Sequence, residues 1–242
     1  MTLFLIGIGL EEEDISLKAI NSLKLCNKIY LESYTSIGVS KEYLEKLLKK
    51  SIKSKDREFF ENESKKIILE AKKENVALLI QGDCLSATTH ISILQEAIDN
   101  KVKTEIIHGI SIFTAISETG LSLYNFGKTT SIPFNNKNIK TPYEVTKSNL
   151  EKDMHTLILL DLNPKENKFL TANEGLKYLI SQGLNENKEA VICSMLGTNK
   201  KEIKKGRVKD LIKIKLKYFP QCIIILGKMH FMEEEFLNKW KT

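Results

Sequence analysis

The run LFLIGIGL, residues 3–10, opens the chain and decides the fold. Its apolar residues are mostly continuous instead of alternating, and it runs into glycine, as strands do when helices cover both faces of their sheet. Five further runs share this character, at residues 76–80, 104–107, 156–160, 190–194 and 222–226. We expect all six runs to be strands.

Segments with helical periodicity separate these runs. They cover residues 14–25, 41–48, 62–73, 91–99, 173–181 and 233–239. Thr171 is followed three residues later by Glu174, a capping-box pattern that predicts a helix start at about Ala172. Alternating strands and helices indicate an α/β protein with mostly parallel sheets.

The alternation breaks between Gly120 and Lys152, where glycine, proline and asparagine cluster among short apolar pieces. Such a change in composition is typical of a connection between domains. We therefore expect two α/β domains, residues 1–124 and 125–242, with the boundary near 124–128.

The composition argues against several classes of protein. The net charge is +6, but the basic residues are almost all lysine, with Arg57 and Arg207 as the two arginines. Proteins that bind nucleic acid favour the planar guanidinium group of arginine, so a lysine-based charge argues against dedicated nucleic-acid binding. We expect the lysines to lie on a solvated surface, and we expect the lysine-rich stretch at 200–205 to be a surface loop. No apolar run reaches the ~18–20 residues of a membrane helix.

Cysteine usage and motif searches narrow the chemistry further. The cysteines form no CxxC pair, so we expect a reducing cytoplasm, no disulfide framework and no metal site; they are Cys26, Cys84, Cys193 and Cys222. The sequence also lacks Gx4GK[ST], HExxH and GxSxG. That argues against a nucleotide hydrolase, a zinc enzyme and a serine hydrolase of familiar pattern.

Three predicted strands end in glycine and polar residues: GIGL at 7–10, GDCLSATTH at 82–90 and HGISI at 108–112. The carboxyl edge of an α/β sheet is the usual ligand crevice, and glycine lets a ligand approach the backbone. Each segment alone reads equally well as an ordinary strand-to-helix turn. If the strands are neighbours, the three ends form one cleft. EEED follows GIGL, so a ligand there should be neutral or cationic.

These segments resemble the diphthine synthases, which belong to the tetrapyrrole-methylase-like S-adenosylmethionine-dependent methyltransferases. The resemblance starts with LIGIGLEEEDISLKAINSLKLCNKIYLESYTS and continues through GDCLSATTH, HGISI, LYNFGK, HTLILLDL, LTANEG, GRVKDL and LGKMH. The family's order and spacing hold from Met1 to about Glu235. The resemblance implies two α/β domains with the cofactor in a cleft between them, and a homodimer.

The activity that the resemblance implies is methylation of the amino group of a 3-amino-3-carboxypropyl chain carried by a histidine of elongation factor 2. The product is diphthine, a step of diphthamide biosynthesis, and the cofactor becomes S-adenosyl-L-homocysteine. Carried over position by position, the cofactor contacts are Leu10, Asp83, Ser86, Ser111, Ile112, Leu160, Leu196 and Gln221. Ser86, Leu196 and Gln221 differ from the residue types usual in the family.

No catalytic residue is singled out. The attacking amine must be neutral, and His90, Asp83, Glu32 or water could take its proton. The segment Tyr34-Thr35-Ser36 could face the acceptor or could be a loop held by hydroxyl groups. Two other functions stay open: a methyltransferase of the same fold for a corrinoid or an rRNA ribose, and a non-catalytic, RNA-associated basic protein.

Overall fold

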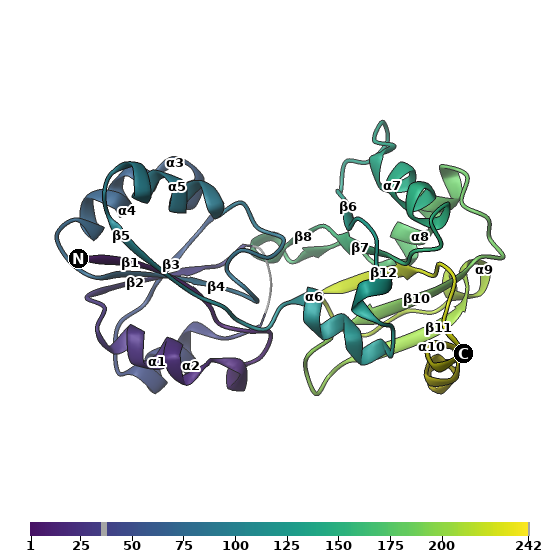
Figure 1. The fold of residues 1–242 in the computed structure, drawn as a ribbon, viewed down its shortest axis with the longest axis horizontal. Coiled ribbons are helices and arrows are strands. Elements are labelled where there is room, and N and C mark those ends of the chain that lie inside the picture. Colours follow the sequence, from purple (N-terminus) through teal and green to yellow (C-terminus); the bar gives the residue numbers. More distant parts are fainter. Residues whose placement is uncertain (35–37, 242) are drawn as a thin grey trace. The chain divides into compact units, whose positions relative to one another are not determined.

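The computed structural model describes residues 1–34 and 38–241. The chain divides into two compact units, Met1–Ile112 and Phe113–Thr242, and each has its own five-stranded sheet (Figure 1). Among the described residues, none of the helices combines the length and hydrophobicity that a membrane span requires.

The first unit is a parallel sheet with the strand order β3-β2-β4-β1-β5. Its strands are β1 (Thr2–Gly7), β2 (Lys28–Glu32), β3 (Lys53–Lys55), β4 (Val76–Ile80) and β5 (Lys103–Ile107). Its helices are α1 (Leu17–Lys24), α2 (Lys41–Leu48), α3 (Arg57–Asn62), α4 (Ser64–Ala71) and α5 (Ile91–Asp99). All three strand runs expected here are strands, and β2 and β3 are additional.

Helices cover both faces of this sheet, as the continuous apolar runs predict. Leu3 and Leu5 of β1 join a core cluster with residues of α3, α4 and α5. Phe4 and Ile6 point to the opposite face and join a cluster with residues of α1 and α2. The side-chain alternation along a strand therefore gives one apolar run two cores.

The second unit has the strand order β11-β10-β12-β7-β6. Its strands are β6 (Thr130–Ile132), β7 (Thr156–Leu160), β10 (Glu189–Ser194), β11 (Glu202–Arg207) and β12 (Gln221–Ile225), and β8 (Leu162–Asn163) and β9 (Lys168–Phe169) form a separate small pair. Its helices are α6 (Ile112–Ala115), α7 (Thr141–Leu150), α8 (Ala172–Ser181), α9 (Val208–Leu211) and α10 (Phe231–Leu237).

Parallel pairing is confirmed for the first sheet but is wrong for the second. There β10 is antiparallel to β11 and β12, and β12 is antiparallel to β7; β6 and β7 alone are parallel. Continuous apolar runs report that both faces of a strand are covered, and they carry no information on strand direction. The short connection from β10 to β11 permits an antiparallel return, whereas a parallel return needs a longer crossover.

The structure tests two local predictions, the capping box at Thr171 and the surface loop at 200–205. The capping box is present: the Thr171 hydroxyl accepts from the Glu174 backbone N–H, and the Glu174 carboxylate accepts from the Thr171 N–H. The loop predicted at 200–205 is wrong from Glu202 onward, where the chain forms β11, and Lys205 is only 4% exposed. The Lys205 ammonium group lies 3.2 Å from the Glu189 carboxylate, which compensates its burial.

The segment after Ile112 belongs to the second unit by its contacts. The Glu118 carboxylate accepts from the Gly197 N–H at 3.1 Å, and Glu233 of α10 accepts from the Ser122 N–H at 2.8 Å. The division between the two units therefore falls earlier in the chain than the predicted domain boundary near 124–128.

Candidate active site

The three glycine-containing strand ends lie side by side in the first unit. β1 pairs in parallel with β4 on one side and with β5 on the other, with Gly7 opposite Ile80 and Ile6 opposite Ile107. GIGL, GDCLSATTH and HGISI therefore leave the sheet at the same carboxyl edge. We expected one cleft if the three strands were neighbours, and they are neighbours in this sheet.

Glycine is required here because the segments after β4 and β5 close over the end of β1. A Cβ atom on Gly7 would lie 2.6 Å from the Gly109 nitrogen and 2.7 Å from the Gly82 oxygen. A Cβ atom on Gly109 would collide with the Gly82 oxygen and the Gly7 backbone. These neighbours are backbone atoms that cannot rotate away, so a larger residue would push the segments apart.

The Asp83 carboxylate ties two of the three segments together. Its Oδ1 accepts from the Leu85 N–H at 3.0 Å and the Ser86 hydroxyl at 2.9 Å. Its Oδ2 accepts from the Gly109 N–H at 3.2 Å and bonds the His108 ring at 2.8 Å. Burial raises the pKa of this carboxyl, but the hydrogen bonds outweigh burial and hold the pKa below its ordinary value. Asp83 is therefore ionised at neutral pH, and it is a poor proton acceptor.

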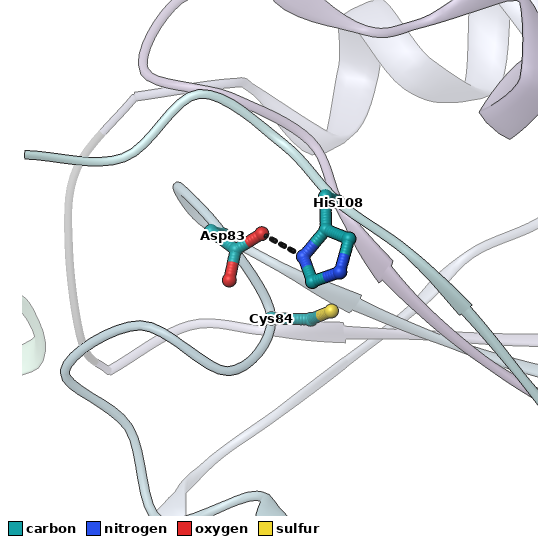
Figure 2. Close-up of side chains that lie close together, drawn as sticks. All are labelled: Asp83, Cys84 and His108. Atoms are coloured by element: carbon teal, nitrogen blue, oxygen red, sulfur yellow. Dashed lines mark hydrogen bonds and ion pairs between the residues drawn. The ribbon is translucent and has the colours of Figure 1, made fainter. Parts of the chain in front are cut away.

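His108 points its Nδ1 atom at Asp83, while 72% of its side chain is exposed (Figure 2). The Cys84 side chain lies next to the His108 ring (Figure 2), and the ligand atoms of Asp83, Cys84 and His108 lie within 4.8 Å of one another. Burial raises the pKa of Cys84 to about 11, and its thiol donates to the Ile107 carbonyl oxygen. A metal ion would need this buried thiol ionised and the Asp83–His108 bond broken, so the arrangement favours a hydrogen-bonded pair beside a neutral thiol.

The acidic segment after GIGL caps the end of β1. The Asp14 carboxylate accepts from the Leu10 N–H at 2.8 Å and the Glu11 N–H at 3.1 Å. Gly9, with φ +83°, makes the turn that brings these groups together, and a Cβ atom there would collide with the Asp14 side chain. The acidic residues thus hold the loop that carries Leu10.

The other first-unit residues predicted to bind cofactor sit on the same edge. Ser86 is half-buried and donates its hydroxyl to Asp83. Ser111 is buried, and Ile112 starts α6. Gly82 packs against two of these segments, because an added Cβ atom would lie in van der Waals contact, at 3.8 Å, with the Ile110 oxygen and with Leu10 Cδ2.

The second-unit residues predicted to bind cofactor also share one edge of their sheet. Leu160 ends β7, Leu196 follows β10, and Gln221 begins β12, which runs antiparallel to both of those strands. The Gln221 amide is fully engaged within the unit: its oxygen accepts from the Ala172 N–H at 2.8 Å and its nitrogen donates to the Tyr218 carbonyl oxygen at 3.0 Å. A ligand would therefore meet the Gln221 backbone.

Of the proton acceptors that the sequence left open, His90 and Glu32 are deeply buried. His90 Nε2 lies 3.9 Å from the Glu32 carboxylate and 3.4 Å from the Tyr34 hydroxyl. Burial lowers the pKa of His90 to about 4, so its ring is neutral at neutral pH. The remaining residues of the YTS segment, Thr35 and Ser36, lie outside the described residues.

Comparisons with known proteins agree with this arrangement. Residues 2–212 match the family described as Tetrapyrrole (Corrin/Porphyrin) Methylases. The diphthine synthases of Methanocaldococcus jannaschii and Methanococcus vannielii are 43% and 42% identical to this chain, over 98% of it and 97% of each relative. A crystal structure of diphthine synthase superposes with a TM-score of 0.93 at 34% identity, covering 100% of this chain and 96% of that one. The crystal structure of a putative diphthine synthase from Entamoeba histolytica superposes with a TM-score of 0.90 at 30% sequence identity, covering 100% of this chain and 98% of that one.

The chain therefore belongs to the tetrapyrrole methylase family and, within it, to the diphthine synthases. It is an enzyme of the methyltransferase class, as the resemblance of its sequence predicts.

Sequence reasoning missed the pairing of Asp83 with His108. The HGISI pattern predicts a close backbone approach and a helix start, and it assigns no role to the histidine. The signal in the sequence is that Asp83 and His108 each follow the end of a predicted strand. If the two strands are parallel and one strand lies between them, these two side chains can meet.

Proposed function

We propose that this chain uses S-adenosylmethionine to methylate the amino group of the 3-amino-3-carboxypropyl chain on a histidine of elongation factor 2, giving diphthine in diphthamide biosynthesis. The observation that carries the proposal is the shared edge of β1, β4 and β5, where glycines let the backbone approach a ligand closely. Relatives named diphthine synthase over nearly the whole chain support the choice of reaction.

The chemistry of this edge fits a sulfonium cofactor. The segments at 7–10, 82–90 and 108–112 contain no lysine or arginine. The Ile110 carbonyl oxygen and the Leu10 side chain lie next to Gly82 at this edge. A partly negative oxygen and an apolar group suit a cation attached to an adenosine, whereas a phosphate would require cationic or N–H donors. When bound, the cofactor supplies an electrophilic methyl group, and the protein positions the reactants.

The proposed cofactor contacts come from both units. They are Leu10, Asp83, Ser86, Ser111 and Ile112 in the first unit and Leu160, Leu196 and Gln221 in the second. Asp83 and Gln221 contribute mainly by holding the backbone around them, because their side-chain oxygens are engaged within the protein. We further propose that the enzyme works in the cytoplasm, as a homodimer, with elongation factor 2 as its protein substrate and without binding nucleic acid or membranes.

Methyl transfer to a defined acceptor tests this proposal. The chain is incubated with radiolabelled S-adenosylmethionine and elongation factor 2 that carries the unmethylated aminocarboxypropyl chain, and mass analysis counts the methyl groups added. The matched control is elongation factor 2 with the unmodified histidine, which should take no label. Label on both forms, or on neither, would contradict the proposal.

Calorimetry with S-adenosylmethionine and with RNA separates the remaining functions. Cofactor binding without RNA binding is expected. RNA binding that needs no cofactor and weakens steeply with salt would instead support a non-catalytic RNA-associated protein. Label transferred to a corrinoid or to rRNA, and not to elongation factor 2, would identify a different acceptor for the same fold.

A further inference from the structure

The Asp83–His108 pair has the geometry of a positioned base. The Asp83 carboxylate has a pKa below its ordinary value, and an ionised carboxylate only accepts hydrogen bonds. Its 2.8 Å contact with His108 Nδ1 therefore places a proton on Nδ1. In the neutral ring the lone pair is then on Nε2, which lies on the ring edge away from Asp83, on the side where Figure 2 draws the Cys84 sulfur. A base whose other nitrogen is held by a carboxylate is the arrangement in which histidine accepts protons during catalysis.

The other three histidines do not combine an exposed ring with a carboxylate partner at the edge proposed for the cofactor. His90 and His155 are 2% and 0% exposed, so water and an acceptor cannot reach their rings. His230 caps the N-terminus of α10, and its Nδ1 accepts from the Met232 N–H at 3.4 Å. His108 combines exposure, a carboxylate partner and a place beside Gly109, at the edge proposed for the cofactor.

We propose that His108 is the general base that removes the proton from the acceptor amine, and that Asp83 is the residue that positions its ring. This inference rests on the function proposed above. Nε2 takes a proton from the ammonium group of the acceptor: an N–H bond breaks in the acceptor and one forms on the ring. The neutral amine then forms a bond to the sulfonium methyl carbon, the carbon–sulfur bond breaks, and its electron pair stays on sulfur as a thioether. The imidazolium, paired with Asp83, returns its proton to water.

The groups around the ring suit this role. Two titratable groups that lie close to His108 are Asp83 and Cys84, both from the segment after β4. Cys84 stays a neutral thiol, because burial raises its pKa to about 11. The end of β1, which lies between β4 and β5, presents the uncharged residues Gly7 and Ile8. The Asp83 carboxylate therefore lies in position to balance the charge of the imidazolium.

The test compares His108→Gln with His230→Gln, a matched change at a histidine outside the proposed machinery. Methyl transfer is measured in single turnovers, with saturating cofactor and acceptor, from about pH 6 to about pH 10. We expect H108Q to be about 10²–10⁴-fold slower than wild type near neutral pH. The difference should shrink as the pH approaches the pKa of a free aliphatic amine, about 8–10, because the acceptor then loses its proton unaided. H230Q should follow wild type throughout.

Three results would overturn the role of His108. The first is that H108Q and H230Q transfer methyl groups at equal rates. The second is that the rate of H108Q falls by the same factor at every pH. The third is that calorimetry finds a loss of S-adenosylmethionine affinity in H108Q large enough to account for the slower reaction. The second would indicate a structural role, and the third a cofactor contact.

Nitrogen NMR of the histidine rings tests the pair without any turnover. Wild type should show His108, assigned from its disappearance in H108Q, with the proton on Nδ1. Asp83→Asn should shift the proton towards Nε2, and a wild-type ring already protonated on Nε2 would contradict the pairing. If wild type methylates no acceptor but keeps the Nδ1 proton, the proposed function fails and the Asp83–His108 geometry stands.

Discussion

Two of the carboxylate–imidazole pairs, Asp83–His108 in the first unit and Glu233–His155 in the second, have opposite surroundings. In the first unit Asp83 bonds His108 at 2.8 Å, and 72% of the histidine side chain is exposed. In the second unit Glu233 Oε2 lies 3.6 Å from His155 Nε2, and the two side chains are 2% and 0% exposed. His155 Nδ1 also accepts from the Gly227 N–H at 2.9 Å, so both of its nitrogens face protein groups.

The difference teaches that burial, and not the residue types, decides what such a pair can do. Glu233 accepts from the backbone N–H groups of Ser122 and His230 and from the Asn125 amide, and it thereby ties the start of the unit to α10. Burial lowers the pKa of His155, although Glu233 opposes that effect. This pair stabilises the fold. The exposed pair can exchange a proton with solvent, and it is therefore the one suited to chemistry.

The largest expected effect on stability is that of Glu233→Ala. The change leaves several buried donors without an acceptor and removes the partner of His155, so the free energy of unfolding should fall by about 3–5 kcal/mol. Denaturant unfolding measures it. Glu233→Gln, which keeps the shape and one acceptor oxygen, is the matched control and should lose less. If E233A is as stable as wild type, Glu233 does not stabilise the fold.

Acid should destabilise the protein through its buried imidazoles. The pKa of His90 is about 4 in the folded chain and about 6.5 when the chain unfolds, so the unfolded chain binds the proton more readily. The stability from neutral His90 is complete above about pH 6.5 and is lost as the pH falls towards 4, by about 3 kcal/mol in total. Unfolding measured against pH should show this loss in wild type and in H108Q, and much less of it in His90→Asn. An identical acid profile in H90N would exclude His90 as the cause.

Gly109→Ala should damage the exposed pair without touching the buried one. The added Cβ atom collides with the Gly82 oxygen and the Gly7 backbone, so the segments after β4 and β5 must separate. We expect a loss of about 1–3 kcal/mol in unfolding free energy. Methyl transfer should also slow, because His108 and Asp83 move apart. Gly183→Ala, at a surface turn of the second unit, is a control for backbone strain, since Gly183 has φ +112°. Unchanged activity in G109A would show that the close approach is not needed.

The smallest expected effect on stability is that of His108→Gln. Its ring is mostly exposed and Asp83 keeps three other hydrogen bonds, so the free energy of unfolding should change by about 1 kcal/mol or less. Thermal and denaturant unfolding check this value. A loss comparable to that of E233A would mean that the first-unit pair is structural as well, and the contrast between the two pairs would disappear.

Much of the fold could be predicted where local signals were strong. The bounds of α2, α5, β4 and β7 agree with the expected segments, because each is a clear helical period or a short apolar run. The sequence does not predict β11, because its EIKKGR segment is mostly charged and carries no apolar run, and Lys205 is stabilised by Glu189 on the neighbouring strand. That pairing depends on the register of β10 and β11, which the sequence does not reveal.

In the candidate site, too, the sequence reveals local patterns but not the contacts between distant residues. The segments at 7–10, 82–90 and 108–112 were recognised because a strand that runs into glycine and polar residues is a local pattern. The bond between Asp83 and His108 joins residues 25 positions apart, and it exists only because β1 lies between β4 and β5 and has glycine at its end.

By itself the sequence determined the α/β class, most strands and helices, the family and the three strand ends that make the candidate site, since each of these follows from local periodicity or from motifs in order along the chain. The tertiary structure alone decided the antiparallel second sheet and which carboxylate meets which imidazole. It also decided which of these pairs reaches water. Those properties depend on strand order, direction and burial, which arise only when distant segments pack together.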